Sequence, residues 1–78
     1  MNNATVWSKD NCGYCVAAIG LLRSKGFSVE VKKVGGGVTK EDLLQAVPGA
    51  RTLPQIFLNN TYIGDYAALL KVFDEDYS

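Results

Sequence analysis

The chain has 78 residues, eight basic and eight acidic side chains, two cysteines and no histidine. This length predicts one small domain over residues 1–78, and the balanced charge predicts no nucleic-acid partner. The apolar runs are shorter than the roughly 20 residues of a membrane-spanning helix, and the start lacks a secretory signal pattern. We therefore expect a cytoplasmic protein with no membrane partner.

The first part of the chain carries the pattern of a strand, a helix and a second strand. The strands are expected at residues 4–8 and 28–34, and the helix at residues 13–25. Gly26 is a typical helix stop. Because a helix that connects two strands gives them a crossover connection, we expect the two strands to be parallel neighbours.

A second helix is predicted to begin at Thr39. Asp42 stands three positions later, which is the spacing of a capping box. The apolar face of this helix is expected to contain Leu43, Leu44 and Val47, and a Pro-Gly pair ends it.

The last part of the chain predicts two short strands and a final helix. The strands, at residues 55–58 and 61–63, are joined by Asn59 and Asn60, which tolerate the positive φ of a tight hairpin. Asp65 is the expected N-cap of the helix. Its predicted buried face contains Tyr66, Leu69, Leu70 and Phe73. The order of elements predicts an α/β fold, with a four-stranded mixed sheet and helices on both sides.

The two cysteines, Cys12 and Cys15, are separated by Gly13 and Tyr14 at the expected start of the first helix. Backbone N–H groups without helical partners and the helix dipole stabilise a thiolate at that position. Such a thiol can have its pKa lowered from about 8.5 into a range of roughly 3.5 to 7.5. A C-x-x-C pair in this context indicates a dithiol/disulfide redox couple.

The helical spacing predicts different roles for the two thiols. Cys15 shares a face with Ile19 and Leu22, so it is expected to be shielded, whereas Cys12 at the N-cap is open to solvent. We expect Cys12 to attack a disulfide and Cys15 to resolve the mixed disulfide. A structural zinc site is excluded within one chain because it needs four Cys or His ligands. Two cysteines that are simply buried remain an alternative, which the polar loop before Cys12 disfavours.

Three separated segments give the chain a resemblance to the glutaredoxin family over nearly its full length. They are Ser8-Lys9 with Cys12-Gly13-Tyr14-Cys15, then Arg51-Thr52-Leu53-Pro54, then Ile63-Gly64-Asp65-Tyr66. The resemblance implies a thioredoxin-like fold with strand order 2-1-3-4 and three helices. It also implies a monomeric glutathione-disulfide oxidoreductase, which takes electrons from glutathione. The implied substrates are protein disulfides, with ribonucleotide reductase as one conceivable partner, and glutathione mixed disulfides.

The same resemblance implies a glutathione groove. Its members are Lys9, Tyr14, Arg51, Thr52, Leu53, Pro54, Gly64, Asp65, Tyr66 and Ala67. In the family the bond before the proline is cis, and Leu53 would present its backbone to the cysteine of glutathione. Lys9 and Arg51 would meet carboxylates, with a solvated surface charge as the alternative for each.

The third segment departs from the family pattern. Glutaredoxins commonly carry a second glycine, a small residue and an aspartate after the first glycine, whereas here Asp65, Tyr66 and Ala67 follow Gly64. Backbone N–H groups at residues 66 and 67 could still hold the γ-glutamyl carboxylate. The acidic partner of the γ-glutamyl amine is displaced, so we expect a lower affinity for glutathione.

Gly13 stands where many dithiol glutaredoxins have proline, and this departure leaves a second function open. In the family, a small residue there is associated with a [2Fe–2S] cluster held between two subunits by their first cysteines, here Cys12, and two glutathiones. Retention of Cys15 favours redox catalysis over this alternative. Trp7, in the expected first strand, is predicted to be a core residue.

Overall fold

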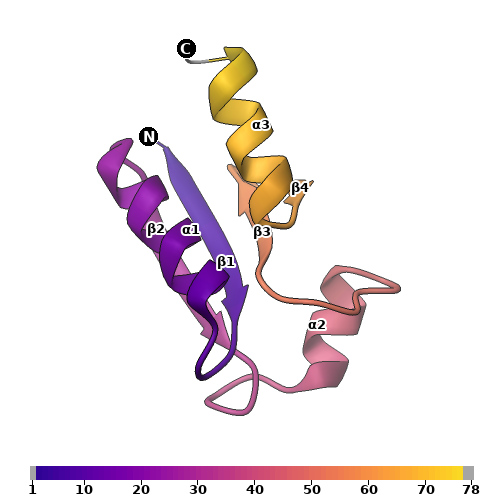
Figure 1. Ribbon diagram of the computed structural model, residues 1–78. Coiled ribbons are helices and arrows are strands. Elements are labelled where there is room, and N and C mark those ends of the chain that lie inside the picture. The colour runs from indigo at the N-terminus through magenta and orange to yellow at the C-terminus, as the bar shows by residue number, and fades with distance from the viewer. Residues whose placement is uncertain (1, 77–78) are drawn as a thin grey trace.

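The computed structural model describes residues 2–76, so residues 1, 77 and 78 of the predicted domain lie outside the described part. All seven expected elements are present in the expected order, and every end for which a residue was predicted differs by no more than one residue. In chain order they are β1 (Asn3–Ser8), α1 (Gly13–Ser24), β2 (Ser28–Lys33), α2 (Lys40–Ala46), β3 (Gln55–Leu58), β4 (Thr61–Gly64) and α3 (Tyr66–Asp76) (Figure 1).

The four strands form one mixed sheet in the order β2-β1-β3-β4. β1 is parallel to β2 and antiparallel to β3, and β3 is antiparallel to β4. Asn59 and Asn60 join β3 to β4 with φ values of 49° and 68°, which confirms the predicted tight turn. This topology, with three helices, is the thioredoxin-like fold that the resemblance implied.

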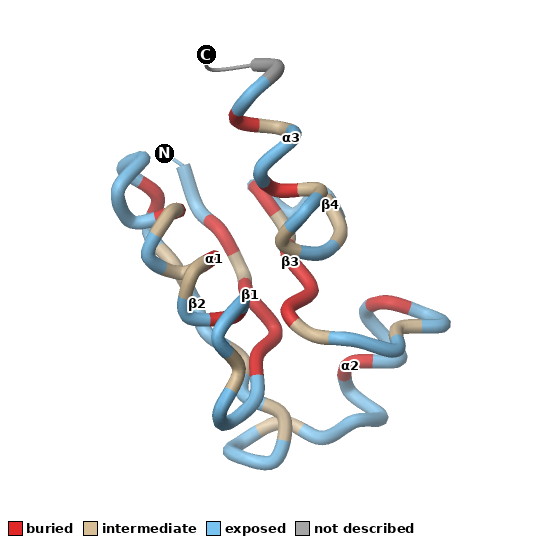
Figure 2. Tube along the Cα trace, viewed as in Figure 1, coloured by how far each residue is buried: buried red, intermediate tan, exposed pale blue. Residues whose placement is uncertain are grey.

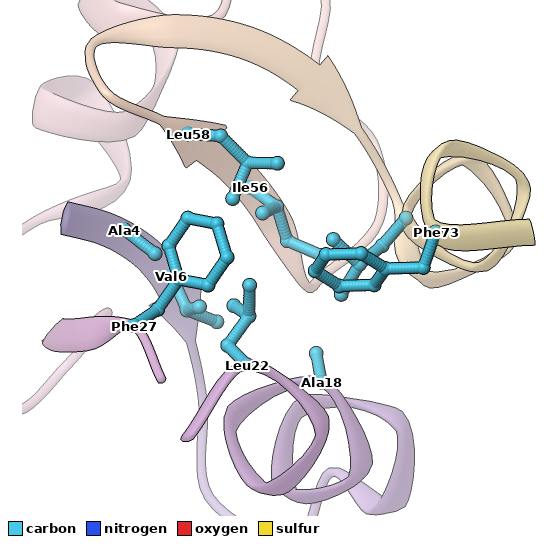
Figure 3. Packing of buried hydrophobic residues seen from close by; sticks show 9 residues of the cluster. Ala4, Val6, Ala18, Leu22, Phe27, Ile56, Leu58 and Phe73 are labelled. Carbon is cyan, nitrogen blue, oxygen red and sulfur yellow. The ribbon is translucent and has the colours of Figure 1, made fainter. Parts of the chain in front are cut away.

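One face of the sheet packs against α1 and α3 and forms the larger core. Alternate residues of β1 and β3 point to this face, because successive side chains of a strand lie on opposite sides. The buried members of this cluster are Ala4, Val6, Ala18, Leu22, Phe27, Ile56, Leu58, Leu69 and Phe73 (Figure 3). Val6, Leu22, Ile56 and Leu69 are fully shielded from solvent.

The other face of the sheet is covered more thinly, by α2. Trp7 points to this side and packs with Leu43 and Val47, so its predicted place in a core is confirmed. The Nζ atom of Lys32 lies 5.3 Å from the centroid of the Trp7 ring. The prediction for Leu44 was wrong: this side chain is 37% exposed, since the short helix turns a single narrow stripe to the sheet. Figure 2 shows most of α2 as exposed.

Local signals fix where the helices begin and end. Gly26 follows α1 with a φ of 86°, a conformation that glycine adopts without steric cost. Thr39 and Asp42 form the complete capping box of α2, because each side chain accepts a hydrogen bond from the backbone N–H of the other. Across residues 2–76, none of the helices has the length and apolar character needed to cross a membrane.

Candidate active site

The two cysteines lie at the N-terminus of α1, as predicted. Cys12 is the N-cap residue with an extended backbone, and its Sγ accepts a hydrogen bond from the Cys15 N–H at 3.2 Å. The half-buried Cys12 side chain is the accessible one of the pair, whereas Cys15 is only 1% exposed. The helix therefore places one sulfur at the surface and one in the interior.

Cys12 and Cys15 form a disulfide, and their Cα atoms are 5.2 Å apart. The structure thus shows the oxidised state of the pair. A covalent bond between them excludes the alternative of two unconnected core cysteines. The attacking and resolving roles of the two thiols stay predictions, because they concern the reduced state.

The segment before β3 lies beside the disulfide. The Leu53–Pro54 peptide bond is cis, as the resemblance implied. The carbonyl oxygen of Leu53 lies 3.8 Å from Cys12 Sγ, although the two residues are 41 positions apart in sequence. The backbone of this segment therefore borders the accessible sulfur of Cys12.

A buried glutamine that was not predicted as a site residue supports that segment. Gln55 is 5% exposed, and its Nε2 donates a hydrogen bond to the Thr52 carbonyl oxygen at 2.8 Å. The hydroxyl of Tyr62 donates in turn to Gln55 Oε1 at 2.6 Å. Burial of an amide requires such partners. The signal in the sequence was a polar residue at the start of an otherwise apolar strand, directly after the proline.

A cavity of about 550 Å³ lies between the segment before β3 and the start of α3. Its volume falls in the range of about 300–1,000 Å³ that is typical of small-ligand sites. The lining residues are Tyr14, Thr52, Leu53, Pro54, Asp65, Tyr66, Ala67 and Leu70. Seven of the ten predicted groove residues are therefore brought together.

Leu70 also lines the cavity, although it was not predicted as a groove residue. It was expected in the buried face of α3, and this was wrong, since the side chain is 45% exposed. Leu69, its neighbour in sequence, was expected in the same face, and this is confirmed, since it lies in the core with no exposed surface. Helical periodicity alone could not decide which edge of a wide apolar stripe would face a cavity.

Three predicted groove residues do not line this cavity. Lys9 lines a separate open depression that includes Cys12, and a Lys33–Asp10 ion pair lies at the same place. Arg51 is exposed. Gly64 is needed for its backbone conformation. Its φ is 128°, which glycine adopts without steric cost, and an added Cβ would lie 3.0 Å from the Cβ of Ala68.

Two contacts shape the end of the cavity beside α3. The rings of Tyr14 and Tyr66 are stacked at a tilt, with centroids 5.6 Å apart, so the aromatic pair bridges α1 and α3. Asp65 caps α3, because its Oδ1 accepts a hydrogen bond from the Ala68 N–H at 3.0 Å. The predicted N-cap is thereby confirmed.

The chain is similar in sequence and in structure to known glutaredoxins. Residues 4–63 match the family model "Glutaredoxin". Glutaredoxin 3 of Escherichia coli K12 is 36% identical over 64 residues, which span 82% of this chain and 77% of that protein. Glutaredoxin-1 of Gallus gallus is 34% identical over 74 residues, spanning 91% of this chain and 73% of that protein.

Among solved structures, reduced E. coli glutaredoxin superposes with a TM-score of 0.77 at 31% identity, covering 95% of each chain. A buckwheat glutaredoxin–glutathione complex gives a TM-score of 0.80 at 26% identity, covering 95% of this chain and 70% of that one.

A thioredoxin-like fold with a C-x-x-C disulfide at the start of its first helix defines a protein of thiol–disulfide redox chemistry. The family match then narrows this class. The chain belongs to the glutaredoxin family, whose members are thiol oxidoreductases.

Proposed function

We propose that this protein is a glutathione-dependent oxidoreductase that reduces protein disulfides and glutathione mixed disulfides. The observation that carries the proposal is the Cys12–Cys15 disulfide at the N-terminus of α1, beside a cavity of small-ligand size. The complex of a similar buckwheat protein with glutathione supports the choice of reductant. We further propose that the protein acts as a monomer in a reducing compartment such as the cytoplasm.

In the reduced protein, Cys12 is placed to make the first attack. A thiolate at this position receives the Cys15 N–H and lies at the positive end of the α1 dipole. It attacks one sulfur of the substrate disulfide, forms a mixed disulfide, and releases the other substrate sulfur as a thiolate, which takes a proton from solvent.

Because Cys15 is buried, we assign it the second step, which is the resolution of the mixed disulfide. Its 1% exposure keeps an external disulfide away from its sulfur, whereas the sulfur of Cys12 lies within reach. The Cys15 thiolate attacks Cys12 Sγ, which closes the protein disulfide and releases the second substrate thiolate. Two electrons have then passed from the protein dithiol to the substrate disulfide.

Glutathione restores the dithiol in two further exchanges. A first glutathione thiolate attacks Cys12 Sγ and frees the Cys15 thiolate. A second glutathione attacks the sulfur of the bound glutathione, which releases glutathione disulfide and the Cys12 thiolate. The backbone of Leu53, whose carbonyl oxygen is 3.8 Å from Cys12 Sγ, is placed to align the bound glutathione. Lys9, in the depression beside Cys12, is placed to attract a carboxylate.

The cluster alternative is not proposed, because Cys15 is retained and bonded to Cys12, which is the arrangement of a dithiol redox pair. The sulfur of Cys12, the one expected cluster ligand, is bonded to Cys15. A [2Fe–2S] site would therefore need reduction of this disulfide and ligands from other molecules.

Single cysteine variants test the proposed function. Cys12→Ser should lose all activity with both a glutathionylated peptide and a protein disulfide, since it removes the accessible thiol. Cys15→Ser should keep reduction of the glutathionylated peptide, in which glutathione itself resolves the mixed disulfide, and lose most reduction of the protein disulfide. Product thiols are quantified in the presence of glutathione, glutathione reductase and NADPH.

The matched control is alkylation of the two reduced variants by iodoacetamide as a function of pH. The thiol of Cys12 in Cys15→Ser should reach half of its maximal rate well below pH ~8.5, the value for an unperturbed thiol. Full activity of Cys12→Ser would contradict the assignment. Ordinary titration of Cys12 near pH ~8.5 would contradict the argument from the helix terminus.

A further inference from the structure

Tyr62, on the edge strand β4, is the outermost member of a series of hydrogen bonds that leads to the active site. Its hydroxyl donates to Gln55 Oε1 at 2.6 Å, and Gln55 Nε2 donates to the Thr52 carbonyl oxygen at 2.8 Å. The next carbonyl oxygen in the sequence, that of Leu53, lies 3.8 Å from Cys12 Sγ. Side-chain hydrogen bonds therefore connect β4 to the residue before the one that borders the accessible sulfur.

The sheet register explains how Tyr62 reaches this position. Gln55 and Phe57 are two positions apart in β3, so both lie on the face of the sheet that is turned to α2. Tyr62 is the register partner of Phe57, and the centroids of their rings are 5.4 Å apart. The contact with Phe57 restricts the Tyr62 ring, and its hydroxyl lies beside the amide of Gln55.

Burial makes the orientation of the Gln55 amide depend on these partners. The side chain is 5% exposed, so both its oxygen and its nitrogen need hydrogen bonds within the protein. A tyrosine hydroxyl that donates to the oxygen leaves the NH₂ group directed at Thr52. Without that hydroxyl the buried oxygen loses its donor, and the amide is no longer fixed in the orientation that binds the Thr52 carbonyl.

The bond from Gln55 also determines which carbonyl group is offered to a substrate. The Thr52 carbonyl is occupied by the glutamine, whereas the Leu53 carbonyl is directed toward Cys12. An extended peptide that binds beside Cys12 pairs with backbone groups of this kind. Its affinity is higher when the backbone is held in place before binding, because less freedom is then lost.

We propose that Tyr62 is a positioning residue for the thiol–disulfide reaction and acts through Gln55 to fix the backbone of residues 52–54. The proposal rests on the proposed function, because it assigns a further residue to the same reaction. Tyr62 is not among the lining residues of the cavity or of the depression beside Cys12. Its effect on the substrate is therefore indirect.

The experiment compares two substrates of the pre-reduced full chain. One is a glutathionylated peptide, whose glutathione backbone must be aligned, and the other is dithiodipyridine, a small disulfide without a peptide backbone. Tyr62→Phe keeps the ring and removes the hydroxyl. The second-order rate constant for release of the peptide thiol should fall about fivefold, as expected for the loss of one hydrogen bond. The rate constant with dithiodipyridine should stay unchanged.

A double variant tests whether Tyr62 acts through the glutamine. Gln55→Met keeps a side chain of similar length and removes both hydrogen bonds, so it should slow the glutathionylated peptide at least as much as Tyr62→Phe. Adding Tyr62→Phe to Gln55→Met should cause no further loss, because the two effects share one route.

The matched control is Ile56→Val, which shortens the fully buried neighbour of Gln55 in β3. It should lower the stability without altering the hydrogen bonds, and both rate constants should stay at the parent values.

Each outcome bears on one of the two proposals. An equal loss with both substrates in Tyr62→Phe, or no loss with either, would overturn the positioning role while the proposed function stands. A further loss in the double variant, or a loss in Ile56→Val confined to the glutathionylated peptide, would overturn it as well. If Gln55→Met does not fold, the comparison of the two substrates with Tyr62→Phe decides alone. Failure of the folded parent chain to reduce the glutathionylated peptide would overturn the proposed function itself.

Discussion

The two faces of the sheet differ in how they are held together. Toward α1 and α3, nine buried residues form one continuous cluster, which Figure 3 shows at close range. Toward α2, three buried residues, Trp7, Leu43 and Val47, form a smaller one. Since buried apolar area dominates folding energetics, the first face should set the stability of the whole domain and the second that of α2.

The active site draws on both regions. Cys12 caps α1 and Cys15 lies within it, and this helix packs on the well-covered face, whereas the Leu53–Pro54 segment lies between α2 and β3. In Figure 1, α2 lies apart from the other two helices. The disulfide thus lies next to the Leu53–Pro54 segment, which is connected to the less buried helix α2. Three substitutions test this comparison, from the largest expected effect to the smallest.

Ile56→Ala should have the largest effect, because it removes a fully buried side chain of β3 from the larger cluster. The free energy of unfolding should fall by about 2–5 kcal/mol, from lost transfer energy and the cavity that remains. Urea denaturation measures this change. The matched control is Val31→Ala on β2, where the side chain is 41% exposed and a change within about 0.5 kcal/mol is expected. Equal effects at both positions would contradict the picture of a single dominant core.

Leu43→Ala should be milder and more local. Its side chain is 6% exposed and belongs to the smaller cluster, so we expect about 2 kcal/mol, at the lower end for a buried leucine. Amide hydrogen exchange in residues 40–46 should become faster, while exchange in β3 changes little. Leu44→Ala, at an exposed position of the same helix, is the control and should leave both rates unchanged. A uniform increase across the sheet would show that the two faces unfold as one unit.

Gly13→Pro should have the smallest effect on stability, within about 0.5 kcal/mol. Position 13 is the first residue of α1, where proline is well tolerated, and an added Cβ would meet nothing within 4 Å. Cys12 before it has φ −110° and ψ 102°, close to the extended conformation that proline requires of its predecessor. Thermal unfolding and the glutathione-coupled assay should both stay near the parent values. A large loss of activity in a folded variant would assign Gly13 a catalytic role.

Local patterns in the sequence predicted most of the fold because each depends on few neighbouring residues. The spacing of Thr39 and Asp42 determined the start of α2, and two asparagines determined the hairpin. The strand order was implied by the resemblance, not by these patterns. The exposure of Leu44 and Leu70 could not be predicted, because it depends on how much of each helix its neighbours cover.

In the site, too, local sequence patterns predicted some features, and tertiary packing determined the others. The positions of both cysteines followed from the start of one helix. The stacking of Tyr14 on Tyr66 joins two helices that are distant in sequence, and only the tertiary structure brings them together. The role of Gln55 likewise depends on Tyr62 in the neighbouring strand and Thr52 in the preceding segment.

The short separation of the two cysteines has a consequence for how folding and oxidation are linked. A crosslink stabilises a fold mainly by restricting the unfolded chain, and the effect grows with the length of the loop that it closes. Here the bonded residues are three positions apart, so the restriction should be smaller than the about 3 kcal/mol expected for a 15-residue loop. The hydrophobic clusters, not the crosslink, therefore carry most of the stability. We therefore expect the reduced form to stay folded, so that a change of redox state at the cysteine pair does not require the chain to unfold.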